Sequence, residues 1–344
     1  MIHDAIKRKK HMKLIAAVLI LIVMLFILAL FDLAWAPKYL SLGDVWDVLM
    51  GRGTWANSII VNDINAPRIV IGILVGASLA IAGAVMQALF KNPMASPYIL
   101  GLSSGASLGA VIGMLFVIPF IPTDVSVPVL AFVFCMGTMF LVYSIGRVGG
   151  HAPTETLLLA GIAVGAFLQA IVSFLTFISG DQLEGIVFWT MGSLSSVSWS
   201  SIGFVFPLMF VGITIMIMFS RDLNAMMLGD AHAMDLGVDV KKVRIILLIA
   251  TSLVTASAVA FCGVIGFVGL VIPHIIRIIL GPDNRLLLPM SILAGSTFMI
   301  LCDLIAHVVA PLYGIIPIGV VTALIGAPYF IYLLTKRKRE VGWN

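Results

Sequence analysis

Few side chains in this sequence could do chemistry inside an apolar environment, and two of them are close neighbours. Asp303 and His307 are four residues apart in one apolar run, so a helix would place them one turn apart. A carboxylate deep in a membrane helix costs roughly 2.5–3.5 kcal/mol, so Asp303 should have a partner. Two interpretations stay open: a structural Asp303–His307 pair, and a proton relay of the kind that a proton-coupled secondary transporter would use.

The motifs of soluble enzymes are missing or misplaced. The sequence has no GxxxxGK motif followed by Ser or Thr, no HExxH and no paired cysteines. One GxSxG match, Gly101–Gly105, falls inside an apolar run, where the strand and turn of a nucleophile elbow are not expected. Cys135, Cys262 and Cys302 are interpreted as small packing residues. We therefore expect no enzyme activity, no catalytic residue, no metal site and no cofactor bound by this chain.

One polar stretch, Arg221 to Arg244, stands out, because it holds eight charged side chains where the whole chain is only 10% charged. Leu223, Met226 and Ala231 recur at helical spacing, and Gly229 interrupts them. An amphipathic element between two apolar runs is typical of a docking surface for another protein. A solvated loop between two membrane spans is the alternative.

The rest of the chain is too apolar for a water-soluble domain, with a mean hydropathy of +1.16 and 61% apolar residues. Runs of about twenty apolar residues bounded by Pro, Gly and charges predict helices that cross a bilayer. We predict an all-α polytopic membrane protein, a single transmembrane domain over residues 1–344. The ten predicted spans are Leu14 to Trp35, Arg68 to Phe90, Tyr98 to Ile118, Val129 to Ile145, Thr156 to Ile178, Ser201 to Ser220, Val243 to Cys262, Phe267 to Leu280, Leu287 to Val309 and Ile316 to Leu334. The eighth is short enough to be re-entrant or broken.

Basic residues predict the orientation of these spans. With both termini cytosolic, only Lys38, Arg52 and Arg68 of the twenty Lys and Arg residues fall outside, as the positive-inside bias requires. The predicted location is thus the cytoplasmic membrane, with Arg221 to Arg244 in the cytosol. The net charge of +4 reflects this topology and does not indicate nucleic acid. A cleaved signal peptide with a site at Ala34–Ala36 fits less well, because the apolar run is long and Pro37 would follow the cut.

Small residues form two stripes along predicted helices. Gly101, Gly105, Gly109 and Gly113 lie on one face, which favours packing against a neighbouring helix. The second stripe continues with polar residues, and packing and the lining of a wet translocation path both stay open for it. Its members are Gly161, Gly165, Gln169 and Ser173. The similar stretches that begin at Leu74 and Leu253 would run in opposite directions, as in the inverted repeat of many transporters.

Several long motifs, in order, resemble the FecCD family of importer permeases, the membrane subunits of type II ABC importers for iron-siderophore complexes, haem and vitamin B12. The resemblance covers about Asn65 to Lys338 and is most specific in NAPRIVIGILVGASLAIAGAVMQALFKNPMASPYILGLSSGASLGA, LNAMMLGDAHAMDLGV, GFVGLVIPHIIRIILGPDNRLLLP and PIGVVTALIGAPYFIYLL. It implies a homodimer of ten-helix subunits. Two cytosolic ATPase subunits, which would carry ATP and Mg, and an extracytoplasmic substrate-binding protein are the implied partners. The cargo stays open between siderophore, haem and corrinoid.

The resemblance also assigns roles to single residues of this chain. The family's cytosolic gate corresponds to Asn92, Met94, Thr154 and Glu155. Docking of the binding protein corresponds to Asn65, Arg68 and His307, where only Arg68 keeps the fixed positive charge of the B12-type members. ATPase coupling corresponds to Leu228, Gly229, Asp230, Ala233, Leu236, Gly237 and Val238.

Overall fold

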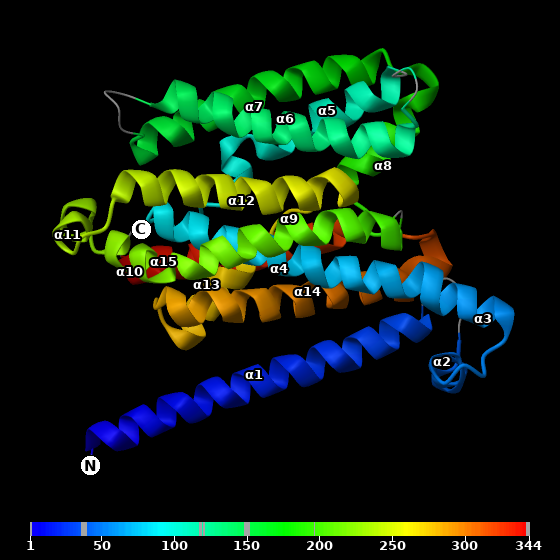
Figure 1. Ribbon diagram of the computed structural model, residues 1–344, viewed down its shortest axis with the longest axis horizontal. Coiled ribbons are helices and arrows are strands. Elements are labelled where there is room, and N and C mark those ends of the chain that lie inside the picture. Colours follow the sequence, from blue (N-terminus) through cyan, green and yellow to red (C-terminus); the bar gives the residue numbers. More distant parts are fainter. Residues whose placement is uncertain are drawn as a thin grey trace.

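The structure is a computed structural model that describes residues 2–35, 40–116, 119, 121–147, 152–195 and 197–341. Within these ranges the regular structure is entirely helical, and the long helices lie side by side as a bundle (Figure 1). Helices suit a bilayer because each one satisfies its own backbone hydrogen bonds where no water is available. The expected all-α membrane fold is confirmed.

In the part of the chain that the structure describes, ten apolar helices correspond to the ten predicted spans, although α1 begins well before Leu14 and α15 continues beyond Leu334. Seven of them are long and apolar enough to cross a membrane, and three are shorter. The long ones are α1 (Ile2–Trp35), α4 (Ala66–Leu89), α6 (Thr123–Gly146), α7 (Thr154–Phe177), α9 (Trp199–Met218), α12 (Val240–Cys262) and α14 (Asn284–Tyr313). The shorter ones are α5 (Leu102–Leu115), α13 (Val268–Leu280) and the apolar part, Ile318–Leu333, of α15 (Ile318–Val341).

Helix α4 occupies the centre of the bundle and packs against α9, α12, α13 and α14. It is rich in Gly, Ala and Ser, which let backbones approach closely where lipid offers no hydrophobic drive for association. Gly83 lies so close to the backbone of Gly269 that a methyl group would not fit, and Gly76 meets Gly295 in the same way. The small-residue composition of α4 therefore explains why it, and not a larger-residue helix, is the buried one.

The glycine stripe of α5 packs against α6, as favoured from the sequence. A Cβ on Gly105 would meet Thr138 of α6, one on Gly109 would meet the backbone at Leu130, and one on Gly113 would lie 3.0 Å from the Cα of Val127. This face of α5 is thus used for helix contact.

The eighth span is short, as predicted. Helix α13 has 13 residues, about 20 Å at 1.5 Å per residue, which is less than a bilayer core. The preceding residues, Gly263–Gly266, are not helical, and Phe267 adopts a left-handed conformation with φ of 66°. The chain therefore turns back into the bundle before α13 begins.

Helices α4 and α12, which carry the two similar stretches, pack together and run in opposite directions (Figure 1). The antiparallel arrangement agrees with the expected inverted repeat.

The two ends of the bundle carry different short elements (Figure 1). Helices α10 (Ser220–Met227) and α11 (Asp230–Asp235) lie at the same end as the start of α1 and the end of α15. Helices α2 (Leu42–Leu49) and α3 (Trp55–Ile59) and the π-helical η1 (Ile60–Asn65) lie at the opposite end. The signal-peptide alternative concerned Ala36 and Pro37, which lie outside the described residues. The remaining short elements are η2 (Pro97–Leu100), η3 (Gly180–Gln182) and α8 (Leu183–Met191).

Candidate functional site

The polar stretch Arg221 to Arg244 forms two short helices joined at Gly229, where the sequence predicted an interruption. Gly229 has φ of 127°, a region that favours glycine, so the chain can turn sharply between α10 and α11. Leu223 and Met226 are buried against the bundle. Leu228 and Leu236 instead are 72% and 68% exposed. The element is therefore anchored on one side and presents apolar side chains on the other.

Asp230, the first residue of α11, joins this element to two other parts of the chain. Its carboxylate lies 3.2 Å from Lys91 Nζ, just after α4, and accepts a 2.7 Å hydrogen bond from Arg244 Nη2 of α12. Arg244 also donates from Nη1 to the backbone oxygen of Ala152, two residues before α7. Lys91 directly precedes Asn92, and Ala152 lies two residues before Thr154, so Asp230 contacts the first predicted gate segment directly and is linked to the second through Arg244.

The charge environment of Asp230 favours its ionised form. Partial burial acts to raise the pKa of this carboxyl, but the hydrogen bonds and charges of Arg244 and Lys91 outweigh it and hold the pKa below its ordinary value. The carboxylate is consequently charged at neutral pH, and both ion pairs persist there.

The side-chain amide of Asn224 joins helix α10 to the start of α14. The Asn224 side chain donates a 2.8 Å hydrogen bond to Asp283, and its oxygen accepts bonds of 2.8 and 2.9 Å from the backbone and side-chain amides of Asn284. Asp283 and Asn284 begin α14. A movement of α10 therefore moves the start of α14 with it.

Two of the predicted gate residues and two of the predicted path residues line one groove. Asn92, Met94, Gly161 and Gly165 surround a space of about 430 Å³ between the turn after α4 and helix α7. Gly161 also packs against the backbone of η2, so packing and lining coexist on this face. Thr154 and Glu155 are not among its lining residues; they begin α7, where Glu155 is exposed. The gate assignment stays a prediction for all four.

A larger groove of about 660 Å³ continues the polar stripe of α7. Gln169 and Ser173 line it from α7, and Ser103 and Ser107 line it from α5. Hydroxyl and amide groups can offer hydrogen bonds to a polar solute or to water without a fixed charge. These residues lie together and could line a wet path, so the assignment of a path stays a prediction with a physical basis.

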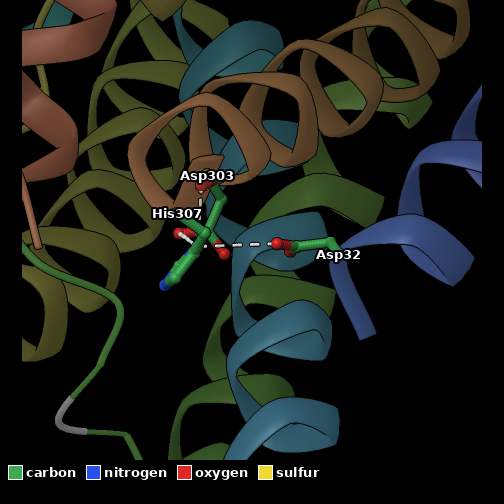
Figure 2. Close-up of side chains that lie close together, drawn as sticks. All are labelled: Asp32, Asp303 and His307. Atoms are coloured by element: carbon green, nitrogen blue, oxygen red, sulfur yellow. Dashed lines mark hydrogen bonds and ion pairs between the residues drawn. The ribbon is translucent and has the colours of Figure 1, made fainter. Parts of the chain in front are cut away.

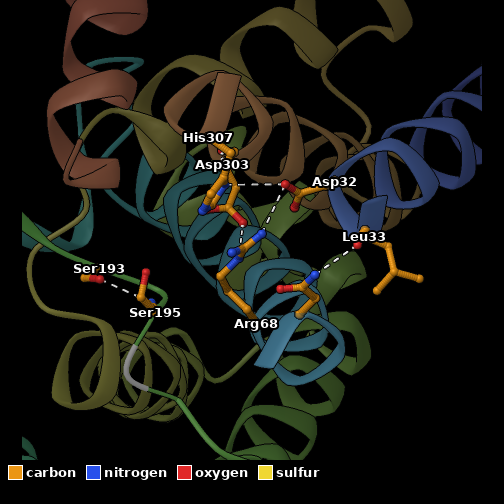
Figure 3. A network of polar contacts seen from close by, with 8 residues as sticks. Asp32, Leu33, Arg68, Ser193, Ser195, Asp303 and His307 are labelled. Atoms are coloured by element: carbon orange, nitrogen blue, oxygen red, sulfur yellow. Dashed lines mark hydrogen bonds and ion pairs between the residues drawn. The ribbon is translucent and has the colours of Figure 1, made fainter. Parts of the chain in front are cut away.

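A buried cluster of ionisable side chains lies near the opposite end of the bundle, where α1, α4 and α14 meet (Figure 2). Arg68 of α4 donates from Nε to Asp303 Oδ2 at 2.9 Å and from Nη2 to Asp32 Oδ1 at 3.2 Å. All three side chains are at most 5% exposed. The guanidinium thus bridges two carboxylates from helices that are far apart in the sequence (Figure 3).

His307 completes this cluster through its Nδ1 atom. That nitrogen lies 2.8 Å from the backbone oxygen of Asp303, 3.5 Å from Asp32 Oδ1 and 3.8 Å from Asp303 Oδ1. The expected partner of Asp303 was His307, whereas its closest partner is Arg68. The expected Asp303–His307 pair is therefore corrected to a cluster of four residues, Asp32, Arg68, Asp303 and His307.

The donor set of Asp32, Asp303 and His307 resembles a metal site by composition, with ligand atoms within 4.8 Å of one another. Arg68, however, already places a positive charge against both carboxylates. A cation bound there would face that charge, so the cluster fits an ion-pair network and does not fit a metal centre.

The docking residues predicted from the family resemblance are not on the surface. Arg68 and His307 are each 3% exposed and Asn65 is fully buried, with its Nδ2 donating to the backbone oxygen of Leu33 at 2.9 Å. The expectation that these side chains form an exposed rim is corrected, because burying a charge requires partners and α1 supplies them. In this conformation they hold α1 against η1, α4 and α14.

The sequence analysis missed several residues of these networks. Asp32 could have been noticed as a lone acid near the end of a long apolar run. Lys91 was counted only as a topology signal, Arg244 only as a topology signal and the end of the polar stretch, and Asn224 carried no charge to attract notice.

Comparison with known proteins agrees with this arrangement. The sequence profile of the FecCD transport family matches residues 20–336. The cobalamin import system permease protein BtuC of Halobacterium salinarum is 45% identical over 285 residues, 82% of this chain and 74% of that protein. The hemin transport system permease protein HmuU of Yersinia pestis is 37% identical over 324 residues, 93% of this chain and 95% of that protein.

Further relatives point the same way. The Fe(3+) dicitrate transport system permease protein FecD of Escherichia coli is 38% identical over 272 residues, 79% of this chain and 84% of that protein. Among solved structures, an inward-facing conformation of a metal-chelate type ABC transporter matches with a TM-score of 0.82 and 31% identity. That match covers 94% of this chain and 99% of the other.

Proposed function

We propose that this chain carries an iron chelate, haem or a corrinoid across the membrane. The premise is that the chain belongs to the FecCD transport family and is a permease subunit of an ABC importer in the plasma membrane. The relatives named above are permeases for cobalamin, hemin and iron(III) dicitrate, each a metal bound by an organic ligand. The uncharged lining of the 660 Å³ groove, which combines hydroxyl and amide groups with apolar side chains, is compatible with such a solute.

The observation that carries the proposal is the position of the α10–α11 element. It exposes Leu228 and Leu236 at one end of the bundle while Asp230 ties it to the segments before the gate residues. A partner that binds the exposed leucines can therefore move the segments that carry the predicted gate residues. We assign Leu228, Gly229, Asp230, Leu236, Gly237 and Val238 to this coupling surface, whereas Ala233, also predicted there, is buried and anchors α11 to the bundle.

The assembly follows from this assignment. Two ATPase subunits, carrying ATP and Mg, would dock on the α10–α11 ends of two copies of this chain. An extracytoplasmic binding protein would dock at the α2–α3 end and deliver cargo. This chain itself performs no hydrolysis and binds no cofactor. Both termini lie in the cytosol, which the concentration of Lys and Arg at the α10–α11 end supports.

Transport then requires a switch between outward-open and inward-open states of the dimer. ATP-driven closure of the ATPases moves α10 and α11, and the Asp230 ion pairs pass that movement to Asn92, Met94, Thr154 and Glu155. Cargo moves along the face formed by Gly161, Gly165, Gln169 and Ser173.

The proposal is tested by uptake into vesicles that contain the complete importer. Uptake of a ferric siderophore, haem or cobalamin should require ATP and should be unaffected by a proton gradient in its absence. Gradient-driven uptake without ATP would overturn the proposal and favour the secondary transporter that uses Asp303 and His307. Gly229→Pro should abolish uptake while the protein still inserts, because Pro cannot adopt a φ of 127°.

A further inference from the structure

Helix α2 has an apolar face that the protein does not cover. It begins with a capping box in which Ser41 and Asp44 exchange hydrogen bonds, so this eight-residue helix has a defined start. Figure 1 shows it nearly end-on, whereas the spanning helices run across the view, so its axis crosses theirs. This is the direction of a helix that lies in the plane of a membrane surface.

The packed side of α2 uses only part of its apolar surface. Val45 and Val48 are buried against Ala34 of α1 and Val61 of η1. A neighbouring strip remains uncovered: Leu42 is 53% exposed, Trp46 60%, Leu49 53% and Met50 48%.

These four residues fall on one side of the helix, since positions i, i+4, i+7 and i+8 share a face at roughly 100° per residue. Asp44 and Asp47 lie on the remaining side. The helix thus has a packed apolar strip, an uncovered apolar strip beside it, and an acidic strip opposite.

The surroundings of α2 identify what covers the open strip. Helix α1, on which α2 packs, has no buried residue in its most apolar stretch, and Phe26, Phe31 and Trp35 are exposed along it. In a membrane permease such a helix faces lipid. Helix α2 packs against both α1 and α3, and α3 begins with Trp55 at 81% exposure, so the open strip of α2 lies between two further elements with exposed apolar side chains.

We propose that α2 and the start of α3 form an interfacial anchor whose Leu42, Trp46, Leu49, Met50 and Trp55 side chains enter the headgroup boundary of the outer leaflet. Tryptophan favours this depth because it has an apolar body and a polar N–H. Asp44 and Asp47 face water. Because the charges on this helix are acidic, the anchor binds by apolar insertion and does not require anionic lipid.

The anchor holds the outer end of α1 at a fixed depth. That end also carries Asp32, which Arg68 binds. The membrane, through α2, and the buried cluster, through Asp32, therefore both fix the position of the outer end of α1.

The test uses the complete importer in nanodiscs, with Trp46 as the only tryptophan and the others replaced by Phe. Lipids brominated near the headgroup should remove roughly half or more of its emission, because interfacial side chains reach about 5–10 Å into the boundary. Lipids brominated near the chain ends should quench it less, and aqueous iodide hardly at all. A protein that keeps only Trp55 provides a second reporter, should the first variant assemble poorly.

A matched control moves the reporter to the acidic strip of the same helix. Asp47→Trp in the Trp46→Phe background should be quenched by iodide and not by brominated lipid. Equal quenching at positions 46 and 47 would overturn the proposal, as would iodide quenching of Trp46 in the free importer. Iodide quenching that disappears only when the binding protein is added would assign the strip to that protein instead.

The leaflet assignment rests on the orientation proposed above, whereas bromine quenching does not depend on it. Labelling of Arg52→Cys in intact cells tests the orientation separately. A label that reacts only from inside would move the anchor to the inner leaflet and reject the proposed topology, leaving insertion itself unchanged.

Discussion

Replacing Arg68 with glutamine should remove the cation that two buried carboxylates share. Arg68 Nε lies 2.9 Å from Asp303 and Nη2 lies 3.2 Å from Asp32, with none of the three side chains more than 5% exposed. Glutamine keeps a donor but not the charge, so Asp32 and Asp303 are left as uncompensated buried acids. Breaking a buried pair in this way costs about 3–5 kcal/mol.

Thermal unfolding of the purified protein in detergent measures this loss. One kcal/mol shifts the midpoint by about 2–4 °C in chains of 150–250 residues and by less in longer ones, so we expect a fall of roughly 5–10 °C. Arg285→Gln is the control, because the Arg285–Asp283 pair has similar geometry but Arg285 is 58% exposed. That variant should unfold within error of the parent.

A second substitution separates charge from shape. Adding Asp303→Asn to Arg68→Gln removes one of the stranded charges and should recover part of the midpoint, whereas Asp303→Asn alone should destabilise. The reasoning is refuted if Arg68→Gln behaves like Arg285→Gln, or if the double variant is less stable than Arg68→Gln.

Three further predictions concern coupling and packing. Asp230→Asn should loosen the link to the gate by roughly 1 kcal/mol, because its ion pairs are partly exposed, and so lower the cargo moved per ATP several-fold. Because the pKa of Asp230 is lowered, its contribution exists above the ordinary value of 3.8 and is lost only as pH falls below it, so coupling in the parent should not change across the neutral range; a loss near neutral pH would contradict this. Leu236→Asp should abolish substrate-stimulated ATPase activity while membrane insertion is retained, since it charges a side chain that is 68% exposed; normal uptake would reject the coupling role. Gly83→Ala should cost about 1–3 kcal/mol or prevent assembly, because its methyl group meets the backbone of Gly269, whereas Gly137→Ala, with open space around it, should be neutral or slightly stabilising in a melting experiment.

Apolar length and charge placement were enough to locate the helices. A bilayer leaves each spanning segment to satisfy its own backbone groups, so a run such as Val243 to Cys262 has only one viable conformation. The same locality explains why Gly229 was found as the break between α10 and α11, and why α13 was expected to be short.

The sequence predicted only some of the helix faces that pack against other helices. The regular spacing of Gly105, Gly109 and Gly113 indicated a packing face, and their contact with α6 confirms it. The stripe from Gly161 to Ser173 was ambiguous in the sequence; in the structure it packs at Gly161 and lines a groove at Gln169, and its role in a translocation path stays a prediction.

The sequence by itself determined where the ten apolar helices and the polar α10–α11 element lie, because those properties depend on neighbours along the chain, whereas the short helices α2, α3 and α8 were not predicted. Only the tertiary structure decided that Arg68 is buried and that Asp303 binds it, across 235 residues of sequence. It also joined Asp230 to Lys91, 139 residues away. Such ion pairs form only between helices that pack together. Shape and small residues determine which membrane helices pack together, and the sequence around an ionisable residue does not show which helix its own helix will contact.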